Sequence, residues 1–227
     1  MIEQAKAVTP DGANIKFIQA AAESLPFLQD HSVDLLVAGQ AAHWFNYTQL
    51  FPELKRITRP GGTLAFWAYK DHVYVDHPQA TRILDHYSYG HDKELLGPYW
   101  PQPGRSIVRD KLRAIQPPAE DWTDIDRIEY EPSVTGGGSG DGRMSMSTTV
   151  TLGQTMEYLR TWSAFHGWME AHPGRQRRSA GGEGDLVDEI FDQMVTAEED
   201  WKDDPEASRE KLVQIEWGTA LLLGRKL

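Results

Sequence analysis

The chain has 227 residues, enough for one sizeable α/β domain, alone or with a small accessory piece. Its formal net charge of −11 at pH 7 repels a phosphate backbone, so we expect no nucleic-acid partner. The absence of cysteine excludes disulfides, thiolate catalysis and cysteine-based zinc sites. The first residues, MIEQAKAVTPDG, lack the apolar centre of a signal peptide, and no stretch approaches the length of a membrane span. We therefore expect a cytoplasmic protein with no membrane partner.

Apolar segments in the first 70 residues predict a parallel sheet. NIKFIQA (14–20) predicts a short strand, and SVDLLVAG (32–39) is a continuous apolar run typical of a strand buried on both faces. Asn46 is a residue type that caps helices, and YTQLFPELKRI after it has helical spacing that ends at TRPGG. TLAFWAY (63–69) predicts a further buried strand. This order is typical of a βαβ series with right-handed crossovers.

The next part of the chain changes in character. Residues 71–118 are polar and rich in His, Tyr and Pro, which predicts a lid-like insertion with a helix in HPQATRILDHYSYG. TDIDRIEYE (123–131) predicts a strand, and TGGGSGDGR (135–143) predicts a flexible loop. Within that loop, GSGDG imitates a glycine-rich phosphate or cofactor turn, but RMSMSTTV after it does not resemble a helix.

The C-terminal half is mainly helical. GQTMEYLRTWSAFHGWMEAH predicts a long helix, a second and acidic helix runs from about Leu186 to Trp201, and KLVQIEWGTALLLGRK predicts a final strand. No linker is long enough to require two domains. We expect one domain over 1–227, with a β-α-β core (1–70), the lid-like insertion (71–118) and C-terminal strands and helices (119–227).

Five segments, taken together and in their order along the chain, indicate a family: AAAESLPF, SVDLLVAGQAAHWFN, LKRITRPGGTLAFWAY, MEYLRTWSAFHGW and EWGTALLLGRK. Together they resemble a class I S-adenosylmethionine-dependent methyltransferase of the trans-aconitate methyltransferase-like group. The resemblance covers most of the chain and implies a Rossmann-like α/β sheet. It also implies methyl transfer from S-adenosylmethionine to a small-molecule acceptor, with the oxygen of a carboxylic acid as one possibility.

The N-terminus departs from this family. The family begins with a strand and a Gly-rich turn that approaches the cofactor, whereas MIEQAKAV resembles the helix after the family's second strand. The resemblance therefore implies an N-terminally truncated sheet whose first strands are missing. Three explanations stay open: a misassigned start codon, a catalytically inactive relative with at most a binding or interaction role, and a sheet completed in a homodimer.

The resemblance implies a cofactor-binding set that follows two strands of the sheet: Ala22, Glu23, Gln40, Ala41, His43 and Trp44. Ala22 and Glu23 would approach the adenine, and Gln40 and Ala41 the middle of the cofactor. His43, the candidate catalytic residue, would lie with Trp44 between cofactor and acceptor; a histidine that only braces its loop is the alternative.

The acceptor side is assigned to aromatic and basic residues. Tyr69, Tyr158 and Trp162 are candidate substrate contacts, with Tyr99 and Trp100 as further candidates for the wall; core packing is the alternative for each. Arg105 and Arg109 could meet an acidic acceptor or simply be exposed. A carboxylate needs no catalytic base, because it is already an anionic nucleophile at neutral pH.

A metal site is not expected. Asp-His and His-Asp pairs recur in the insertion, and both side chains are metal ligands. However, the histidines there are spaced by five, nine and five residues, which fits no single helical face.

Overall fold

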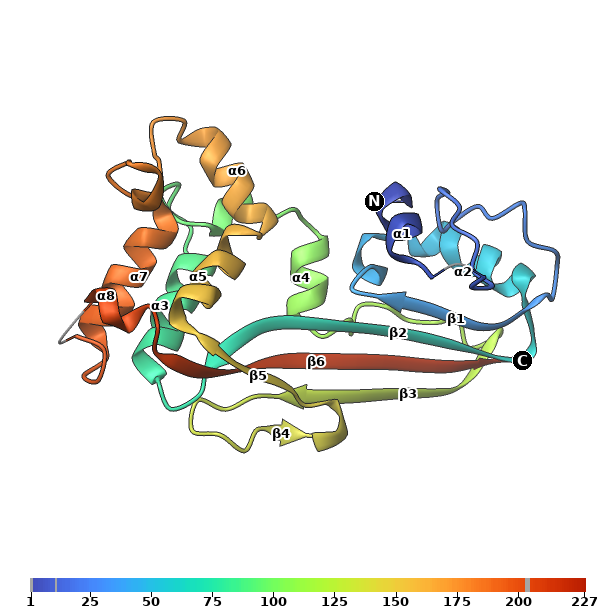
Figure 1. Ribbon diagram of the computed structural model, residues 1–227. Helices are drawn as coiled ribbons and strands as arrows, with labels where there is room; N and C mark the ends of the chain where they lie inside the picture. The colour runs from blue at the N-terminus through green and yellow to red at the C-terminus, as the bar shows by residue number, and fades with distance from the viewer. Residues whose placement is uncertain (1, 11, 203–204) are drawn as a thin grey trace.

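The computed structural model describes residues 2–10, 12–202 and 205–227, and its strands form one mixed six-stranded sheet (Figure 1). The strands are β1 (Val33–Gly39), β2 (Thr58–Tyr74), β3 (Trp122–Glu131), β4 (Ser139–Gly140), β5 (Met146–Thr151) and β6 (Leu212–Lys226). The α-helices are α1 (Ile2–Val8), α2 (Tyr47–Ile57), α3 (Pro78–Tyr89), α4 (Gly104–Arg109), α5 (Leu152–Arg160), α6 (Ser163–Ala171), α7 (Leu186–Ala197) and α8 (Pro205–Ser208). Short 3-10 helices are η1 (Ala42–Trp44), η2 (Gly97–Tyr99), η3 (Gly142–Met144) and η4 (Arg178–Ala180).

The sheet runs in the order β1-β2-β6-β3-β4, and β5 pairs with β6 off this path. β1 and β2 are parallel and joined through α2, which confirms the predicted βαβ unit. β6 is antiparallel to β2, β3 and β5. β2 and β6 are the long strands, of 17 and 15 residues, and Figure 1 shows them crossing the whole molecule.

One end of these long strands carries the α2 lobe (residues 33–69). The apolar side chains of α2 recur at helical spacing, and Leu50, Phe51, Leu54 and Ile57 are all buried. They belong to the same core as residues of β2 such as Phe66. This packing explains why the pattern of the segment YTQLFPELKRI predicted its helix correctly.

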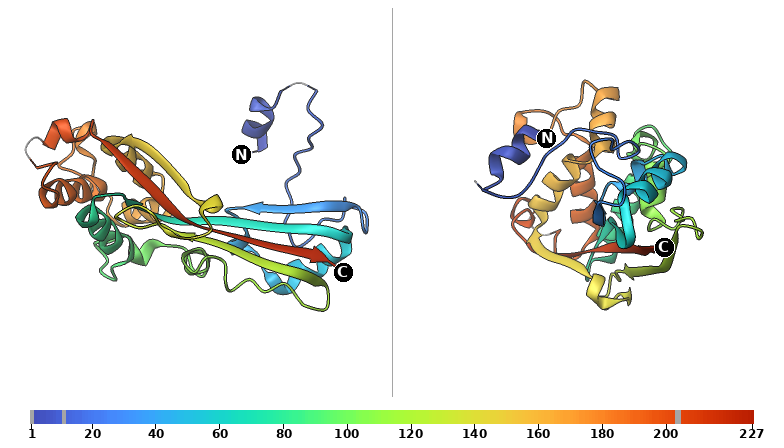
Figure 2. Two further views of the ribbon diagram at one scale, coloured as in Figure 1. Left: turned by 90° about the horizontal axis from the view of Figure 1, so that it is seen from below. Right: turned by 90° about the vertical axis from the view of Figure 1, so that its right-hand side faces the viewer.

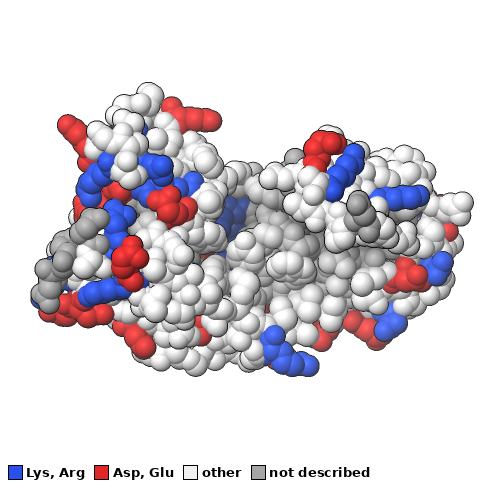
Figure 3. Space-filling view, viewed as in Figure 1, with Lys and Arg blue, Asp and Glu red and all other residues white. Residues whose placement is uncertain are grey.

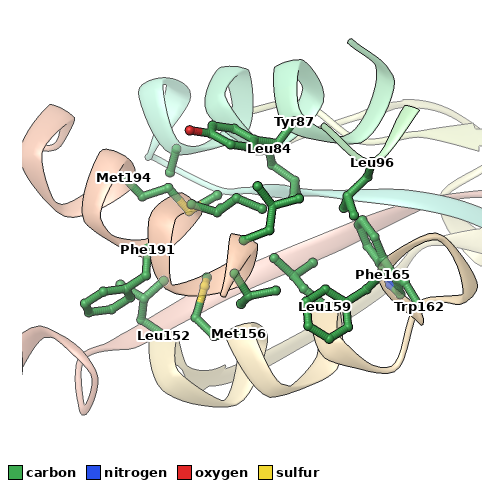
Figure 4. Close-up of a cluster of buried hydrophobic side chains, with 14 of the residues drawn as sticks. Leu84, Tyr87, Leu96, Leu152, Met156, Leu159, Trp162, Phe165, Phe191 and Met194 are labelled. Carbon is green, nitrogen blue, oxygen red and sulfur yellow. The ribbon is translucent and has the colours of Figure 1, made fainter. Parts of the chain in front are cut away.

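The other end carries the helical lobe (residues 78–99 and 152–202). Figure 4 shows side chains of α3, α5, α6 and α7 meeting in one core, among them Leu84, Met156, Leu159, Phe165 and Phe191. α5 and α7 each begin with a capping box, in which the cap side chain and the third helical residue bond each other's backbone N–H.

The long helix expected around residues 153–172 is two helices. Trp162 adopts an extended backbone between α5 and α6, and its ring packs 5.3 Å from that of Trp100 and 5.9 Å from that of Tyr158. The acidic helix also ends earlier than expected, at Ala197, because Glu198 is extended. Trp201, beyond the end of α7, is buried against Tyr74.

The strand expected at 14–20 is wrong. Residues 14–20 join no strand, and Ile15 and Ile18 are about half exposed. In Figure 2 the N-terminal segment with α1 stands away from the sheet. A strand needs a neighbour for its backbone hydrogen bonds, and this segment has none in the sheet that the structure describes.

β1 is also less buried than its apolar sequence predicts. It lies at the edge of the described sheet, with β2 as its neighbour there, and Leu35 and Val37 are 56% and 61% exposed. The expectation of burial on both faces is therefore wrong for this strand. Across the described residues, no helix is both long and apolar enough to cross a membrane.

Candidate functional site

A cavity of about 330 Å³ lies where the α2 lobe meets the helical lobe. Figure 3 shows the surface hollowed between the two lobes. The cavity is next to the carboxyl ends of the parallel strands, the place where open α/β sheets bind ligands. Six of the nine residues assigned from the sequence line it: Gln40, His43, Trp44, Tyr69, Tyr158 and Trp162.

Gln40 fixes the end of β1 against β2. Its side-chain amide donates to the Tyr69 carbonyl over 2.9 Å, and its side-chain oxygen accepts from the Tyr69 N–H over 3.0 Å. Its backbone has φ of +50°, which is uncommon for a residue other than glycine. Because the amide is engaged by the backbone at both ends, Gln40 shapes the cavity by positioning Tyr69.

His43 and Trp44 follow in the 3-10 turn η1, with ring centroids 4.6 Å apart. His43 is buried, and its Nδ1 has no hydrogen-bond partner among the described residues. Burial, and to a smaller extent the charge of Arg105, lowers the pKa of His43 below its usual value, so the ring is neutral at pH 7. The ring therefore presents an unpaired polar atom beside the cavity.

Trp44 reaches across to the first residue of α4. Its ring lies so close to Gly104 that a Cβ atom there would sit 2.6 Å from the Trp44 Cζ3. A glycine is therefore required at 104 to let the indole close this side of the cavity, although the ring remains 56% exposed.

Of the two candidate arginines in the insertion, Arg105 lines the cavity. Its guanidinium carbon lies 3.8 Å from the centre of the Trp100 ring, and its Nη2 donates to Asp71 and to the Tyr89 hydroxyl. Its buried Nε has no partner in the part of the chain described. The Nε–H group of Arg105 can thus donate a hydrogen bond to a ligand oxygen.

Arg109 lies elsewhere, with its guanidinium 3.6 Å from the centre of the Tyr89 ring, and it does not line this cavity. Asp71, which pairs with Arg105, was missed as a site residue. The signal for it in the sequence is the Asp-His pair at 71–72, whose residue types are also those of a metal motif. Within the described residues, no three His, Cys, Asp or Glu side chains are grouped to hold a metal ion.

Three assigned residues lie outside the cavity lining. Glu23 accepts a 2.8 Å hydrogen bond from the Asn46 N–H and so ties residues 20–27 to the start of α2. Asn46 is the cap residue, as expected, but its side chain makes no capping bond. Ala22 packs against the core under α2, and the carbonyl of Ala41 accepts from the Trp44 N–H.

The two further wall candidates separate. Trp100 lines the cavity and donates its indole N–H to the Ser88 carbonyl over 2.8 Å. Tyr99 points its hydroxyl to the Lys93 carbonyl and packs near His172, away from the cavity. Sequence pattern alone could not divide these neighbours.

Several known proteins are similar to this chain in sequence. Residues 1–66 match the family model of a methyltransferase domain. A "Probable S-adenosylmethionine-dependent methyltransferase" of Saccharomyces cerevisiae is 31% identical over 168 residues, which cover 71% of this chain and 56% of that protein. A proposed methyltransferase of Dictyostelium discoideum is 24% identical over 94% of this chain and 67% of its own length. The chain thus spans little more than half of the yeast relative.

The fold has a counterpart among solved structures. A proposed type II methyltransferase from Anaeromyxobacter dehalogenans superposes with a TM-score of 0.62 at 24% identity, over 95% of this chain and 74% of that one. This confirms the expected Rossmann-like, mixed α/β methyltransferase fold. The chain is thus similar in fold to a solved methyltransferase structure and similar in sequence to proteins named as methyltransferases.

Proposed function

We propose that this chain carries the acceptor side of an S-adenosylmethionine-dependent methyltransferase site, and that the acceptor is a small carboxylic acid methylated on oxygen. The observation that carries the proposal is Arg105, whose guanidinium lines the cavity with an unpaired buried Nε. A carboxylate is the anionic partner that an arginine donor prefers. The resemblance to the trans-aconitate methyltransferase-like group points to the same acceptor class.

The residues around the cavity suit the reactive end of the cofactor. A sulfonium is a cation, and cations are attracted to the faces of aromatic rings. Trp44, Tyr69, Tyr158 and Trp162 all line the cavity. His43 is neutral, so it adds no repelling charge. Trp44 and Tyr69 would hold the methyl-donor end, and bound S-adenosylmethionine would supply the methyl group.

The chain's own residues then bind, orient and exclude water. Arg105 would donate from Nε to one oxygen of the acceptor, while the other oxygen stays free as the nucleophile. Asp71 keeps the guanidinium in place, and the Gln40 clamp fixes Tyr69 opposite. The carboxylate is ionised at neutral pH, so no residue needs to remove a proton.

Calorimetric titration of the purified chain with S-adenosylmethionine tests the proposal, followed by transfer of labelled methyl groups to a panel of small acids and their amides. We expect saturable heat and transfer to acids only. Arg105→Gln should raise KM for the acid by roughly tenfold or more, through loss of a charge-assisted hydrogen bond. Arg59→Gln, a matched change of an exposed arginine that lines neither this cavity nor the one beside it, should leave KM unchanged.

The alternative is a catalytically inactive methyltransferase-like protein with at most a binding or interaction role. Absence of heat at millimolar S-adenosylmethionine, together with retained binding of the acids, would favour that alternative. Absence of both would contradict the proposed site.

A further inference from the structure

A second cavity, of about 350 Å³, lies beside the first on the other side of the Asp71 carboxylate. The end of β2 and one face of α3 provide much of its lining. Lys70 and Asp71 line both cavities. The second cavity is thus a neighbouring compartment of the site, and of the residues considered from the sequence Arg109 lines it.

Two buried polar side chains in its lining have no partner. His72 is 2% exposed, and neither its Nδ1 nor its Nε2 makes a hydrogen bond to any described residue. Ser88 is 1% exposed, and its Oγ likewise lacks a partner within the described chain. A buried polar group left unpaired costs about 1–3 kcal/mol, so two of them around one cavity indicate that something with hydrogen-bonding groups occupies it.

Most charged groups of this compartment are matched to one another. Lys70 pairs with Glu131 at 2.6 Å, Arg109 approaches Asp85 at 3.4 Å, and Asp71 pairs with Arg105. Arg82 also lines the cavity, but it is exposed, and its Nε approaches only the Pro78 carbonyl, at 3.4 Å. A charged ligand would have to break one of the pairs or stay at the exposed Arg82. The unpaired groups are a hydroxyl and an imidazole, and burial lowers the pKa of His72 to about 4, so that ring is neutral. Each can both donate and accept, which is the pattern that an alcohol complements.

We propose that the second cavity binds an uncharged, hydroxyl-bearing group, such as a short alcohol or polyol segment, through His72 and Ser88. The wall between the two compartments is made of side chains: the Tyr89 hydroxyl donates to Asp71, and Arg105 donates to both. Because this wall is shared with the acceptor cavity, the bound group is the distal part of the acceptor. The assignment of this group to the acceptor rests on the proposed function, whereas the binding of a hydroxyl-bearing group in the second cavity does not.

The absence of cysteine makes the compartment directly testable. Ser88→Cys in the full chain places a single thiol in the lining, and disulfide exchange can be followed by intact-mass spectrometry. The probes are four thiols of similar size: thioglycerol, propanethiol, mercaptopropionate and cysteamine. We expect thioglycerol to be captured about fivefold more strongly than propanethiol, for one net hydrogen bond to His72, and both charged thiols to be captured less.

Two variants make the test specific. In Ser88→Cys/His72→Phe, which keeps the ring, the preference for thioglycerol should disappear. Ser208→Cys is the matched control, because Ser208 is equally buried and lines neither cavity. It should show no preference among the thiols.

Equal capture of thioglycerol and propanethiol would mean that the cavity holds only water, and would overturn the proposal. A preference for a charged thiol, a preference that survives His72→Phe, or no capture at all would overturn it as well. If Ser88→Cys does not fold, the ring ¹⁵N shifts of His72 in the unaltered chain decide: they should move saturably with 1,2-propanediol and not with propionate. None of these measurements needs methyl transfer, so failure here is distinguishable from failure of the proposed function.

Discussion

The two ends of β2 lie in very different surroundings. Toward the α2 lobe, β2 pairs with the edge strand β1, whose Leu35 and Val37 are more than half exposed. Toward the helical lobe, the same strand ends at Tyr74, which is fully buried against Trp201. The Tyr74 hydroxyl donates a hydrogen bond to the Thr155 hydroxyl. The candidate site forms between the end of β2 that adjoins an exposed edge strand and the end that is fully buried. We expect changes in the buried helical lobe to cost more stability than changes on the exposed face of β1.

The largest expected effect comes from the buried ion cluster of the helical lobe. Arg160 donates to Asp185 and Asp188, and all three side chains are at most 10% exposed. Arg160→Met should cost roughly 3–5 kcal/mol in urea unfolding, because it removes the cation that pairs with both buried carboxylates. The control in the α2 lobe is Arg59→Met, which breaks an exposed pair with Asp34 and should cost less than about 1 kcal/mol. Equal costs would contradict the comparison.

The same cluster predicts a pH dependence. Burial raises the pKa of Asp188, but hydrogen bonds from the backbone of Arg178 and Asp185 and the charge of Arg160 outweigh it, so the folded-state pKa lies below the usual value. The contribution of Asp188 to stability is then complete above about pH 5 and is lost as the pH falls through the lowered folded-state pKa. Unfolding free energies of the protein and of Asp188→Asn, measured across this range, should converge at the acid end. A constant difference would show that the carboxylate contributes nothing through its charge.

A matched pair of leucines sharpens the contrast in packing. Leu159 is fully buried in the core of the helical lobe, so Leu159→Ala should cost about 2–5 kcal/mol. Leu35→Ala on the exposed face of β1 should cost about 0.5 kcal/mol or less. Chemical denaturation of both variants measures the difference, and a large loss in Leu35→Ala would mean that the β1 face is covered in solution.

Loss of the two hydrogen bonds between the Gln40 side chain and the Tyr69 backbone should have a smaller effect on stability. Gln40→Ala removes two hydrogen bonds to the Tyr69 backbone and should cost about 1–2 kcal/mol. Gln40→Glu retains the acceptor and loses the amide donor, so it should fall between the two proteins in thermal unfolding. Indistinguishable melting of Gln40→Ala and the parent chain would show that the clamp is not formed.

The smallest expected effect is electrostatic and lies within the cavity. Arg105 contributes to lowering the pKa of His43, after the larger contribution of burial. Arg105→Gln should therefore raise the pKa of His43, and an NMR titration of its ring protons measures the change. Arg109→Gln, which leaves the group facing His43 in place, should not move it.

Local pattern predicted the elements that pack locally. The spacing of Leu50, Leu54 and Ile57 predicted α2, and the apolar runs predicted β1, β2 and β6, because these properties depend on residues close in sequence. Segment 14–20 was predicted wrongly, since its composition suits a strand while pairing depends on a neighbour far along the chain.

The site shows the same division. The family resemblance predicted Gln40, His43 and Trp44 as site residues, and all three line the cavity, while their roles stay a prediction. The partnership of Asp71 with Arg105, 34 residues away in sequence, and the unpaired atoms of His72 are visible only once the chain is folded. Trp100 packs against Trp162 at a break between two helices that the helical pattern did not predict.

β2 and β6 are paired from Thr63↔Arg225 to Tyr74↔Ile215, interrupted by one irregularity between Tyr69 and His72. Two strands that are hydrogen-bonded over such a length lie beneath both lobes. This long pairing restricts a hinge motion of one lobe relative to the other. Above these strands, one side of the cavity is closed by the six-residue α4 and by the Trp44 indole, which rests on the first residue of that helix.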